Sequence, residues 1–205
     1  MTEQSGNAVD HPRTGRTPLL IGIDSTIGRS MAAYLSTTAS PFHATTRRPQ
    51  GASTRCSFLD LRYDLTSWRP PPGTGPVYIC AAISQIDACE RDPTESAQVN
   101  TEGPITIARR CAESGAFVVF LSTSQVFDGA TPRCRPEDSP SPLTTYGRQK
   151  ALAEAGIGAL GSQSAIVRLT KVLPPDSGLL GGWIDALQAG DVIRPFSDLV
   201  FAPVT

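Results

Sequence analysis

The stretch LLIGIDSTIG, residues 19–28, decides the fold class, because it predicts a buried strand that turns sharply into a helix. The apolar residues of LLIGI occupy consecutive positions, as in a strand that is covered on both faces. Gly22 and Gly28 then allow a tight turn and a close approach of the helix, which is expected to begin at about Gly28. A strand that enters a helix in this way presents free backbone N–H groups and the positive end of the helix dipole.

This loop is a candidate pyrophosphate site, formed by Gly22, Ser25, Thr26, Ile27 and Gly28. The usual fingerprint has a third glycine where this chain has Ser25, and the Cβ of a serine would stand between the backbone and the phosphate. We therefore expect a degraded version of the fingerprint. A glycine pair at such a turn also occurs for close packing alone, and the sequence leaves that alternative open.

Short apolar runs alternate with helical segments along the rest of the chain. Strands are expected at residues 19–23, 42–46, 57–61, 77–82, 116–122 and 165–169, and helices from about residue 28, across 93–114 and at 146–160. Such alternation predicts an α/β fold, a Rossmann-type doubly wound parallel sheet with helices on both faces. The stretches 70–76 and 129–142, rich in Pro, predict a turn-rich connector and a loop.

Composition and charge argue against several classes of protein. The chain has 205 residues, of which 40% are hydrophobic and 18% charged, as in an ordinary globular domain. A net charge of −1 with both signs scattered leaves no basic face for nucleic acid. No apolar run approaches the ~18 residues that a membrane span needs, and no signal-peptide pattern is present, so the expected location is cytoplasmic. Five cysteines without a CxxC pair and two separated histidines indicate neither a disulfide framework nor a metal site.

The second expected strand ends in Arg47 and Arg48, and neither Asp nor Glu follows it. Folds that prefer NAD often place an acid here for the ribose 2′-hydroxyl, whereas an arginine accommodates the 2′-phosphate of NADP. NADP(H) is therefore predicted over NAD(H), with a solvated basic turn as the alternative. After the third strand, Asp60, next to Leu61, is a candidate acceptor for the adenine amino group. Asp64 is a weaker candidate, and either aspartate could instead form a turn.

The most specific motif is Tyr146-Gly147-Arg148-Gln149-Lys150. A spacing of four places Tyr146 and Lys150 on one helix face, where the ammonium would lower the phenol pKa and reach ribose hydroxyls. Tyr146 is thereby a candidate proton donor. Another strand runs into Ser122-Thr123-Ser124, and hydroxyls at the carboxyl end of a parallel strand lie where ligands bind in open α/β sheets. A surface helix pair and a plain turn are the alternatives to an active site.

With these residues in place, the chain resembles the extended short-chain dehydrogenases/reductases, and within them the dTDP-4-dehydrorhamnose reductase-like sugar-nucleotide-binding family. The resemblance covers residues 18–205 and rests on blocks in the same order: GIDSTIG, VYICAAIS, DACERDPTESAQVNTEGP, FVVFLSTSQVFDG, TTYGRQK, AIVRLTKVL and PFSDLVFAPVT. It implies that NADP(H) lies across the strand ends and that a hydride passes to the 4-keto group of a nucleotide-activated sugar.

The resemblance also implies roles for individual residues. Thr123 would orient the keto oxygen, Tyr146 would protonate it, and Lys150 would bind the ribose. The resemblance implies two further groups of residues. The cofactor site would include Ala81, Ala82 and Asn100, and the substrate site would include Ser124, Gln125, Arg168 and Lys171.

Three regions of the chain are expected. Residues 1–17 predict a disordered leader, because they are polar and lack an apolar period. Residues 18–170 predict the NAD(P)-binding Rossmann domain. Residues 171–205 predict the start of a substrate-binding lobe that is only partly present, because the family continues beyond this C-terminus.

The sequence supports one leading hypothesis and leaves others open. An NADPH-dependent reductase of a nucleotide-activated 4-keto sugar accounts for the complete Thr-Tyr-Lys set. The alternative is a non-catalytic module that binds NADP or a sugar nucleotide and acts as a sensor or regulatory subunit. An epimerase or dehydratase is a third reading, although Ser124 and Gln125 replace the family's usual Asp-Tyr pair and supply no carboxylate for dehydration. The sugar and the oligomeric state are not identified, and a homodimer is left open.

Overall fold

The computed structural model describes residues 15–173 and 178–194. Its centre is a six-stranded parallel sheet in the order β3-β2-β1-β4-β5-β6. The strands are β1 (Thr17–Ile21), β2 (His43–Thr46), β3 (Cys56–Phe58), β4 (Thr74–Ile79), β5 (Val118–Thr123) and β6 (Ser164–Leu169). The chain therefore winds outward in both directions from β1 and β4, and the predicted α/β fold is confirmed.

Several strand boundaries differ from the prediction, and the starts of β1 and β4 differ for the same reason. Thr17 pairs with Thr74 at the amino end of β1 and β4, and the register shifts between Thr17 and Leu19. Because of this pairing, β1 begins one residue before the expected domain start at Pro18, and β4 begins inside the expected connector at 70–76. Residues 1–14 of the expected leader lie outside the described residues.

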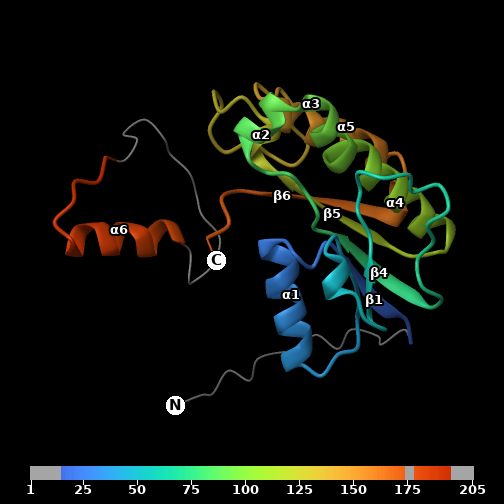
Figure 1. The fold of residues 1–205 in the computed structure, drawn as a ribbon. Coiled ribbons are helices and arrows are strands. Elements are labelled where there is room, and N and C mark those ends of the chain that lie inside the picture. Colours follow the sequence, from blue (N-terminus) through green and yellow to red (C-terminus); the bar gives the residue numbers. More distant parts are fainter. Residues whose placement is uncertain (1–14, 174–177, 195–205) are drawn as a thin grey trace, which may run out of the picture.

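Helices cover both faces of the sheet (Figure 1). The helices are α1 (Thr26–Thr37), α2 (Ile86–Arg91), α3 (Pro93–Ala97), α4 (Gly103–Glu113), α5 (Thr145–Gly158) and α6 (Gly178–Gln188). A π-helical segment, Gln98–Glu102, joins α3 to α4, and short 3-10 turns stand at Pro49–Gly51, Ser124–Val126 and Gly161–Gln163. Helix α2 was not predicted, because six residues are too few to show a helical period.

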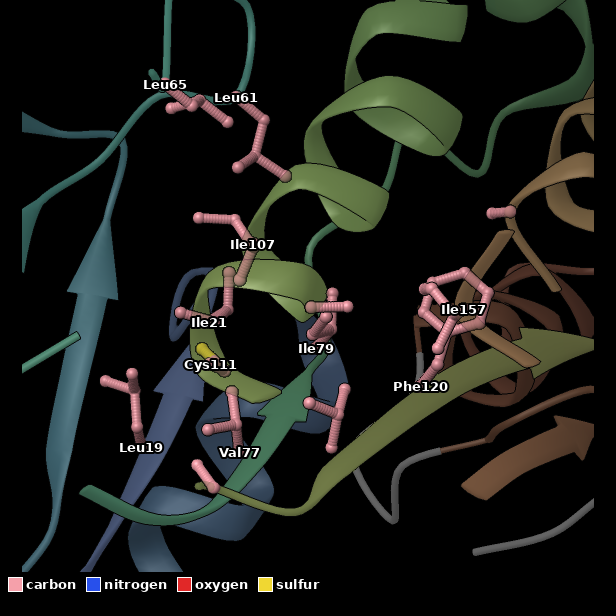
Figure 2. Packing of buried hydrophobic residues seen from close by; sticks show 14 of the residues in the cluster. Leu19, Ile21, Leu61, Leu65, Val77, Ile79, Ile107, Cys111, Phe120 and Ile157 are labelled. Carbon is pink, nitrogen blue, oxygen red and sulfur yellow. The ribbon is translucent and has the colours of Figure 1, made fainter. Parts of the chain in front are cut away.

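The larger core lies between the sheet and helices α4 and α5 (Figure 2). Leu19, Ile21, Val77 and Ile79 point to this side, and Figure 2 shows Ile107 and Cys111 of α4 beside them. Leu20 points to the opposite face and packs with Ala32 of α1. A strand with apolar residues on both sides is the pattern that the run LLIGI predicted.

The last described helix stands apart from the sheet (Figure 1). Trp183, Ile184 and Leu187 of α6 are exposed. The ending PFSDLVFAPVT and residues 174–177, both within the expected partial lobe, lie outside the described residues. Within the part of the chain that the structure describes, no helix has the length and apolar character to cross a membrane.

Candidate cofactor and catalytic site

The glycine loop after β1 is shaped by two glycines that have no room for a side chain. Gly22 has a φ of 88°, and a Cβ built on it would lie 2.7 Å from the Cβ of Ala81. A Cβ on Gly28 would overlap the carbonyl oxygen of Gly22. The loop therefore lies against the end of β4 on one side and against its own helix on the other.

Ser25 caps α1 and does not need to be glycine. Its backbone is extended, with φ −73° and ψ 159°, a conformation that any residue adopts. The hydroxyl donates to the carbonyl oxygen of Gly22 at 2.9 Å and accepts from the N–H of Gly28 at 3.0 Å. The Ser25 hydroxyl therefore closes the turn from inside, and the expectation that the Ser25 Cβ hinders a phosphate stays a prediction.

The loop fits a pyrophosphate at the start of α1. The first N–H groups of a helix have no acceptor within the helix, and Ser25 satisfies only that of Gly28. The N–H groups of Thr26 and Ile27 are the neighbouring donors, and the positive end of the helix dipole adds to their pull on an anion. The predicted loop residues thus lie together, as a dinucleotide would require.

An acid does stand at the end of β2, and the loop supplies it. The Oδ2 atom of Asp24 accepts hydrogen bonds from Thr46 Oγ1 at 2.7 Å and from the backbone N–H of Arg47 at 3.0 Å. Its Oδ1 atom lies 3.6 Å from Nε of Arg48. Neither Asp nor Glu follows β2 in the sequence, yet the fold brings the carboxylate of Asp24 to the end of this strand. Asp24 was missed because it precedes β2 by about twenty residues and reaches that strand only through the parallel pairing of β1 with β2.

The candidate adenine acceptor already has a partner. Asp60 is buried, and Nε and Nη2 of Arg62 donate to its carboxylate, the shortest contact being 2.6 Å. The hydrogen bonds from Arg62 hold the Asp60 pKa below its ordinary value, although burial opposes them, and the charge of Arg47 adds to the lowering. Leu61 belongs to the core. Asp64 closes a turn by accepting from the N–H and hydroxyl of Thr66, which matches the alternative left open for it.

Thr123 and Tyr146 meet where β5 ends and α5 begins. Tyr146 is 8% exposed and shares a hydrogen bond with Thr123. Burial raises the Tyr146 pKa to about 12, a negative charge on Cys89 would add to this, and the hydrogen bond from Thr123 acts in the opposite direction. The phenol therefore keeps its proton at neutral pH.

Lys150 lies below this pair in a closed environment. Its ammonium donates to the carbonyl oxygen of Leu121 at 2.7 Å and stands 3.8 Å from the centroid of the Phe120 ring. Burial lowers the Lys150 pKa to about 7, against the charge of Glu154, and a negative charge on Cys80 would also oppose the lowering. The expected lowering of the Tyr146 pKa by Lys150 is wrong, because desolvation of the phenol dominates. Contact between Lys150 and a ribose stays a prediction.

Asn100 is enclosed at the centre of the π-helical segment. Its Oδ1 accepts from the N–H of Ile83, while its Nδ2 donates to the carbonyl oxygen of Ile83 and to Oε1 of Gln149, each at 2.9 Å. Any effect of Asn100 on a cofactor would therefore pass through the backbone that follows β4. Ala81, partly buried, and Ala82, exposed, belong to that same backbone.

Arg168 has a bracing role in the structure, and its expected contact with a substrate stays a prediction. Its guanidinium binds both oxygens of Glu154, with a shortest distance of 2.7 Å, and donates to the carbonyl oxygens of Pro136 and Asp138. It also stands 4.9 Å from the centroid of the Phe127 ring. Arg168 thus ties the loop at 129–142 to α5 and β6. Lys171 is exposed just beyond β6.

Two further contacts position the start of α5, and sequence reasoning missed them. Glu90 of α2 accepts from both the N–H and the hydroxyl of Thr145, each at 2.7 Å. A Cβ on Gly147 would overlap the carbonyl oxygen of Gln125, which lies in the turn Ser124–Val126. The expected substrate residues Ser124 and Gln125 therefore lie against the first turn of α5.

The strand order gives these groups a shared location. The glycine loop follows β1 and Ala81 follows β4, so both lie where the chain reverses its direction of winding, while Thr123 ends the next strand, β5. Open α/β sheets bind their ligands at that switch point, outside the carboxyl ends of the strands. The fold is that of a Rossmann-type α/β domain, and the carboxyl ends of its central strands form a candidate dinucleotide site.

A family model described as the RmlD substrate binding domain matches residues 17–181. The chain belongs to this family.

Curated relatives match over part of their length. The chain is 30% identical over 123 residues to methionine adenosyltransferase 2 subunit beta from Pongo abelii. This match covers 60% of this chain and 34% of that protein. It is 36% identical over 104 residues to dTDP-4-dehydrorhamnose reductase from Mycobacterium tuberculosis, 48% of this chain and 34% of the reductase. The chain thus spans about a third of the length of each of these relatives.

Solved structures share the fold at low sequence identity. A dTDP-4-dehydrorhamnose reductase from Clostridium acetobutylicum superposes with a TM-score of 0.70 at 23% identity, over 84% of this chain and 60% of that one. MoeE5 in complex with UDP-glucose and NAD has a TM-score of 0.69 at 22% identity, over 89% of this chain and 64% of that one. A Bacillus anthracis dTDP-4-dehydrorhamnose reductase in complex with NADP has a TM-score of 0.67 at 18% identity, over 84% of this chain and 61% of that one.

Proposed function

We propose that this chain is the nucleotide-binding part of an NADPH-dependent reductase that acts on a nucleotide-activated 4-keto sugar. The observation that carries the proposal is the hydrogen-bonded pair of Thr123 and Tyr146, which stands beside a helix N-terminus suited to a pyrophosphate. A proton donor next to a dinucleotide site is the arrangement that reduction of a carbonyl group requires.

The roles of the residues follow from their environments. A bound nicotinamide cofactor supplies the hydride. Tyr146, with its pKa raised to about 12, retains a proton that it can give to the keto oxygen. Thr123 holds that oxygen through its hydroxyl. Lys150, with a pKa lowered to about 7, donates to the Leu121 carbonyl oxygen in this structure and would bind ribose hydroxyls in the complex.

To hold the cofactor, Lys150 has to exchange its hydrogen bond with the Leu121 carbonyl oxygen for one with a ribose hydroxyl. A ribose hydroxyl would supply an acceptor to a cation that burial keeps from water.

The proposed preference for NADP(H) over NAD(H) rests on Arg47 and Arg48. Both are exposed at the end of β2, where the adenosine ribose lies in dinucleotide-binding folds of this type. Guanidinium groups there offer charge-assisted hydrogen bonds to a 2′-phosphate. Among the similar structures, that of the Bacillus anthracis reductase contains NADP and that of MoeE5 contains NAD, so the fold accepts either cofactor.

The proposed partner is a nucleotide sugar. MoeE5 carries UDP-glucose in its solved structure, and the similar reductases are named for a dTDP-linked keto sugar. In this chain Ser124 and Gln125 follow Thr123 and lie beside the first turn of α5, so their side chains are the nearest candidates for contact with the sugar. Substrate contact by these two residues is part of the proposal.

A second candidate function is a binding module without turnover. The similarity to methionine adenosyltransferase 2 subunit beta favours it, because that protein is named as a subunit and matches over more of this chain than the Mycobacterium tuberculosis reductase does. Such a module would keep the glycine loop and the arginines and would have no need of a proton donor.

Two measurements test the proposal. Fluorescence titration with NADPH and NADH should show binding of both, tighter for NADPH. In a protein that carries the complete substrate-binding lobe, dTDP-, UDP- or GDP-linked 4-keto sugars should then oxidise NADPH, and Tyr146→Phe should slow this by ~10²–10⁴-fold while leaving NADPH affinity nearly unchanged. Binding of NADPH without any oxidation by that complete protein would favour the binding module, and absence of binding would overturn both functions.

A further inference from the structure

Asp24 forms a bridge between the glycine loop and the end of β2. One carboxylate oxygen accepts from the Thr46 hydroxyl and the Arg47 N–H, and the other faces Nε of Arg48. The Thr46 hydroxyl in turn accepts from the N–H of Arg48 at 3.0 Å. The carboxylate is therefore held in one orientation by three consecutive residues, and its side chain is 19% exposed.

The same carboxylate competes for the groups that would hold a 2′-phosphate. The Arg48 side chain is 67% exposed and already has Asp24 as its ion-pair partner. Arg47 lies close enough to Asp60 for its charge to lower the pKa of that carboxyl. Each arginine thus faces a carboxylate, and a phosphate that entered this turn would meet the negative charge of Asp24 as well as the arginines.

A 2′-hydroxyl would meet a different situation. Ionised carboxylates are acceptors only, and an ion-paired carboxylate still has lone pairs for a neutral donor. In dinucleotide-binding folds the acid at the end of the second strand accepts from the ribose 2′-hydroxyl. Asp24 brings a carboxylate to that place from the preceding loop.

We propose that Asp24 determines the cofactor specificity of this chain by accepting from the 2′-hydroxyl of NADH and by disfavouring the 2′-phosphate of NADPH. The inference rests on the proposed function and refines it. Arg47 and Arg48 give the site its affinity for the 2′-phosphate, and Asp24 reduces the resulting preference for NADPH over NADH. Removing the charge at position 24 releases Arg48 for the phosphate.

The test is a titration of the 205-residue chain with NADH and NADPH, before and after Asp24→Asn. Asparagine has the same shape and keeps an oxygen for the Thr46 hydroxyl and the Arg47 N–H. The ratio of the NADH Kd to the NADPH Kd should rise about tenfold, as for the loss of one repulsive charge against a phosphate. Asp92→Asn is the matched control, because it removes one negative charge at the α3 cap, and its ratio should stay at the wild-type value.

A second variant keeps the inference testable if Asp24→Asn fails to fold. Asp24→Ser removes the same charge and keeps a hydroxyl oxygen that can accept a hydrogen bond, so it should raise the ratio of the NADH Kd to the NADPH Kd as Asp24→Asn does. An unchanged ratio in folded Asp24→Asn would overturn the role of Asp24 while leaving the proposed function intact. Failure of the folded wild-type chain to bind either cofactor would instead overturn the proposed function.

Discussion

Gly147 lies so close to the carbonyl oxygen of Gln125 that any Cβ at position 147 would overlap it. The first turn of α5 is therefore pressed against the turn that follows β5. This close approach places Tyr146 beside Thr123, with which its phenol interacts. A glycine that lacks positive φ is in this way required by space alone.

Gly147→Ala should destabilise the fold and separate Tyr146 from Thr123. Overpacking of a closed site costs about 1–3 kcal/mol, so urea denaturation should show a loss of that size in the free energy of unfolding. Gly158→Ala, in the last turn of the same helix, is the matched control. Its Cβ would make an ordinary contact of 3.7 Å with Ile166, and alanine has the higher helix propensity, so stability should stay equal or rise. Equal losses in both variants would contradict the prediction.

The buried Lys150 should make stability rise with pH above neutrality. Its pKa is lowered from 10.5 to about 7, so between these values the unfolded chain binds a proton that the folded chain has released. Stability therefore increases with pH in this window, by up to about 1.4 kcal/mol per pH unit. Urea denaturation at a series of pH values from 7 to 9 should show the rise, and Lys150→Met should abolish it.

The rise should end above about pH 9. Burial raises the pKa of Cys80 and of Cys111 from 9.0 to about 12, so these thiols ionise in the unfolded chain before they do in the folded one. The unfolded chain then binds fewer protons, and stability falls. A wild-type profile that is flat from pH 7 to 9, and the same as that of Lys150→Met, would show that the ammonium is better solvated than its position indicates.

Arg168→Met should cost about 3 kcal/mol, because it leaves the Glu154 carboxylate buried without its guanidinium partner. The side chain of Glu154 is 5% exposed and that of Arg168 is 19% exposed. Arg168→Met combined with Glu154→Gln should lose less than the sum of the single losses, which a double-mutant cycle in urea would measure. Arg110→Met is the control, since its partner Glu113 is 62% exposed and the pair should contribute less than about 1 kcal/mol.

Ser25→Ala should destabilise the chain by about 1 kcal/mol, whereas Ser25→Gly should cost only a few tenths. Alanine removes the oxygen that accepts from Gly28, and glycine is a tolerated cap. Thermal denaturation of both variants gives the comparison. NADPH affinity should be nearly unchanged in Ser25→Gly, because the serine hydroxyl is engaged within the loop. A large loss of affinity in that variant would assign the hydroxyl to the phosphate.

The fold was predictable because its strands are apolar at consecutive positions. Runs such as LLIGI and FVVFL are buried on both faces of a parallel sheet, and only that environment gives their pattern. The Thr123-Tyr146 pair was also within reach, since a strand end and a helix start that are linked by one loop must lie close together. Short elements escaped prediction, as α2 shows, because six residues contain less than two helical turns.

The electrostatic partners were not predictable from spacing. Asp24 and Thr46 stand 22 positions apart, and Arg168 and Glu154 14 apart, so only the packed structure pairs them. The pKa of Tyr146 was expected to fall because Lys150 is four residues away, yet the depth of burial determines its direction. Sequence gives the neighbours along a helix, whereas desolvation depends on the whole fold.

Where β1 and β4 end, Gly22 lies against Ala81, and neither residue has a side chain larger than a methyl group. Under the proposed function, the side chains that select a ligand therefore come from the two sides of this pair. Asp24 and the arginines lie on the β2 side, and Thr123 and Tyr146 lie on the β5 side. Because these two groups come from separate stretches of chain, mutation can alter one and spare the other. A lineage built on this fold can therefore abandon chemistry while it keeps its nucleotide, and can exchange one nucleotide for another while it keeps its chemistry.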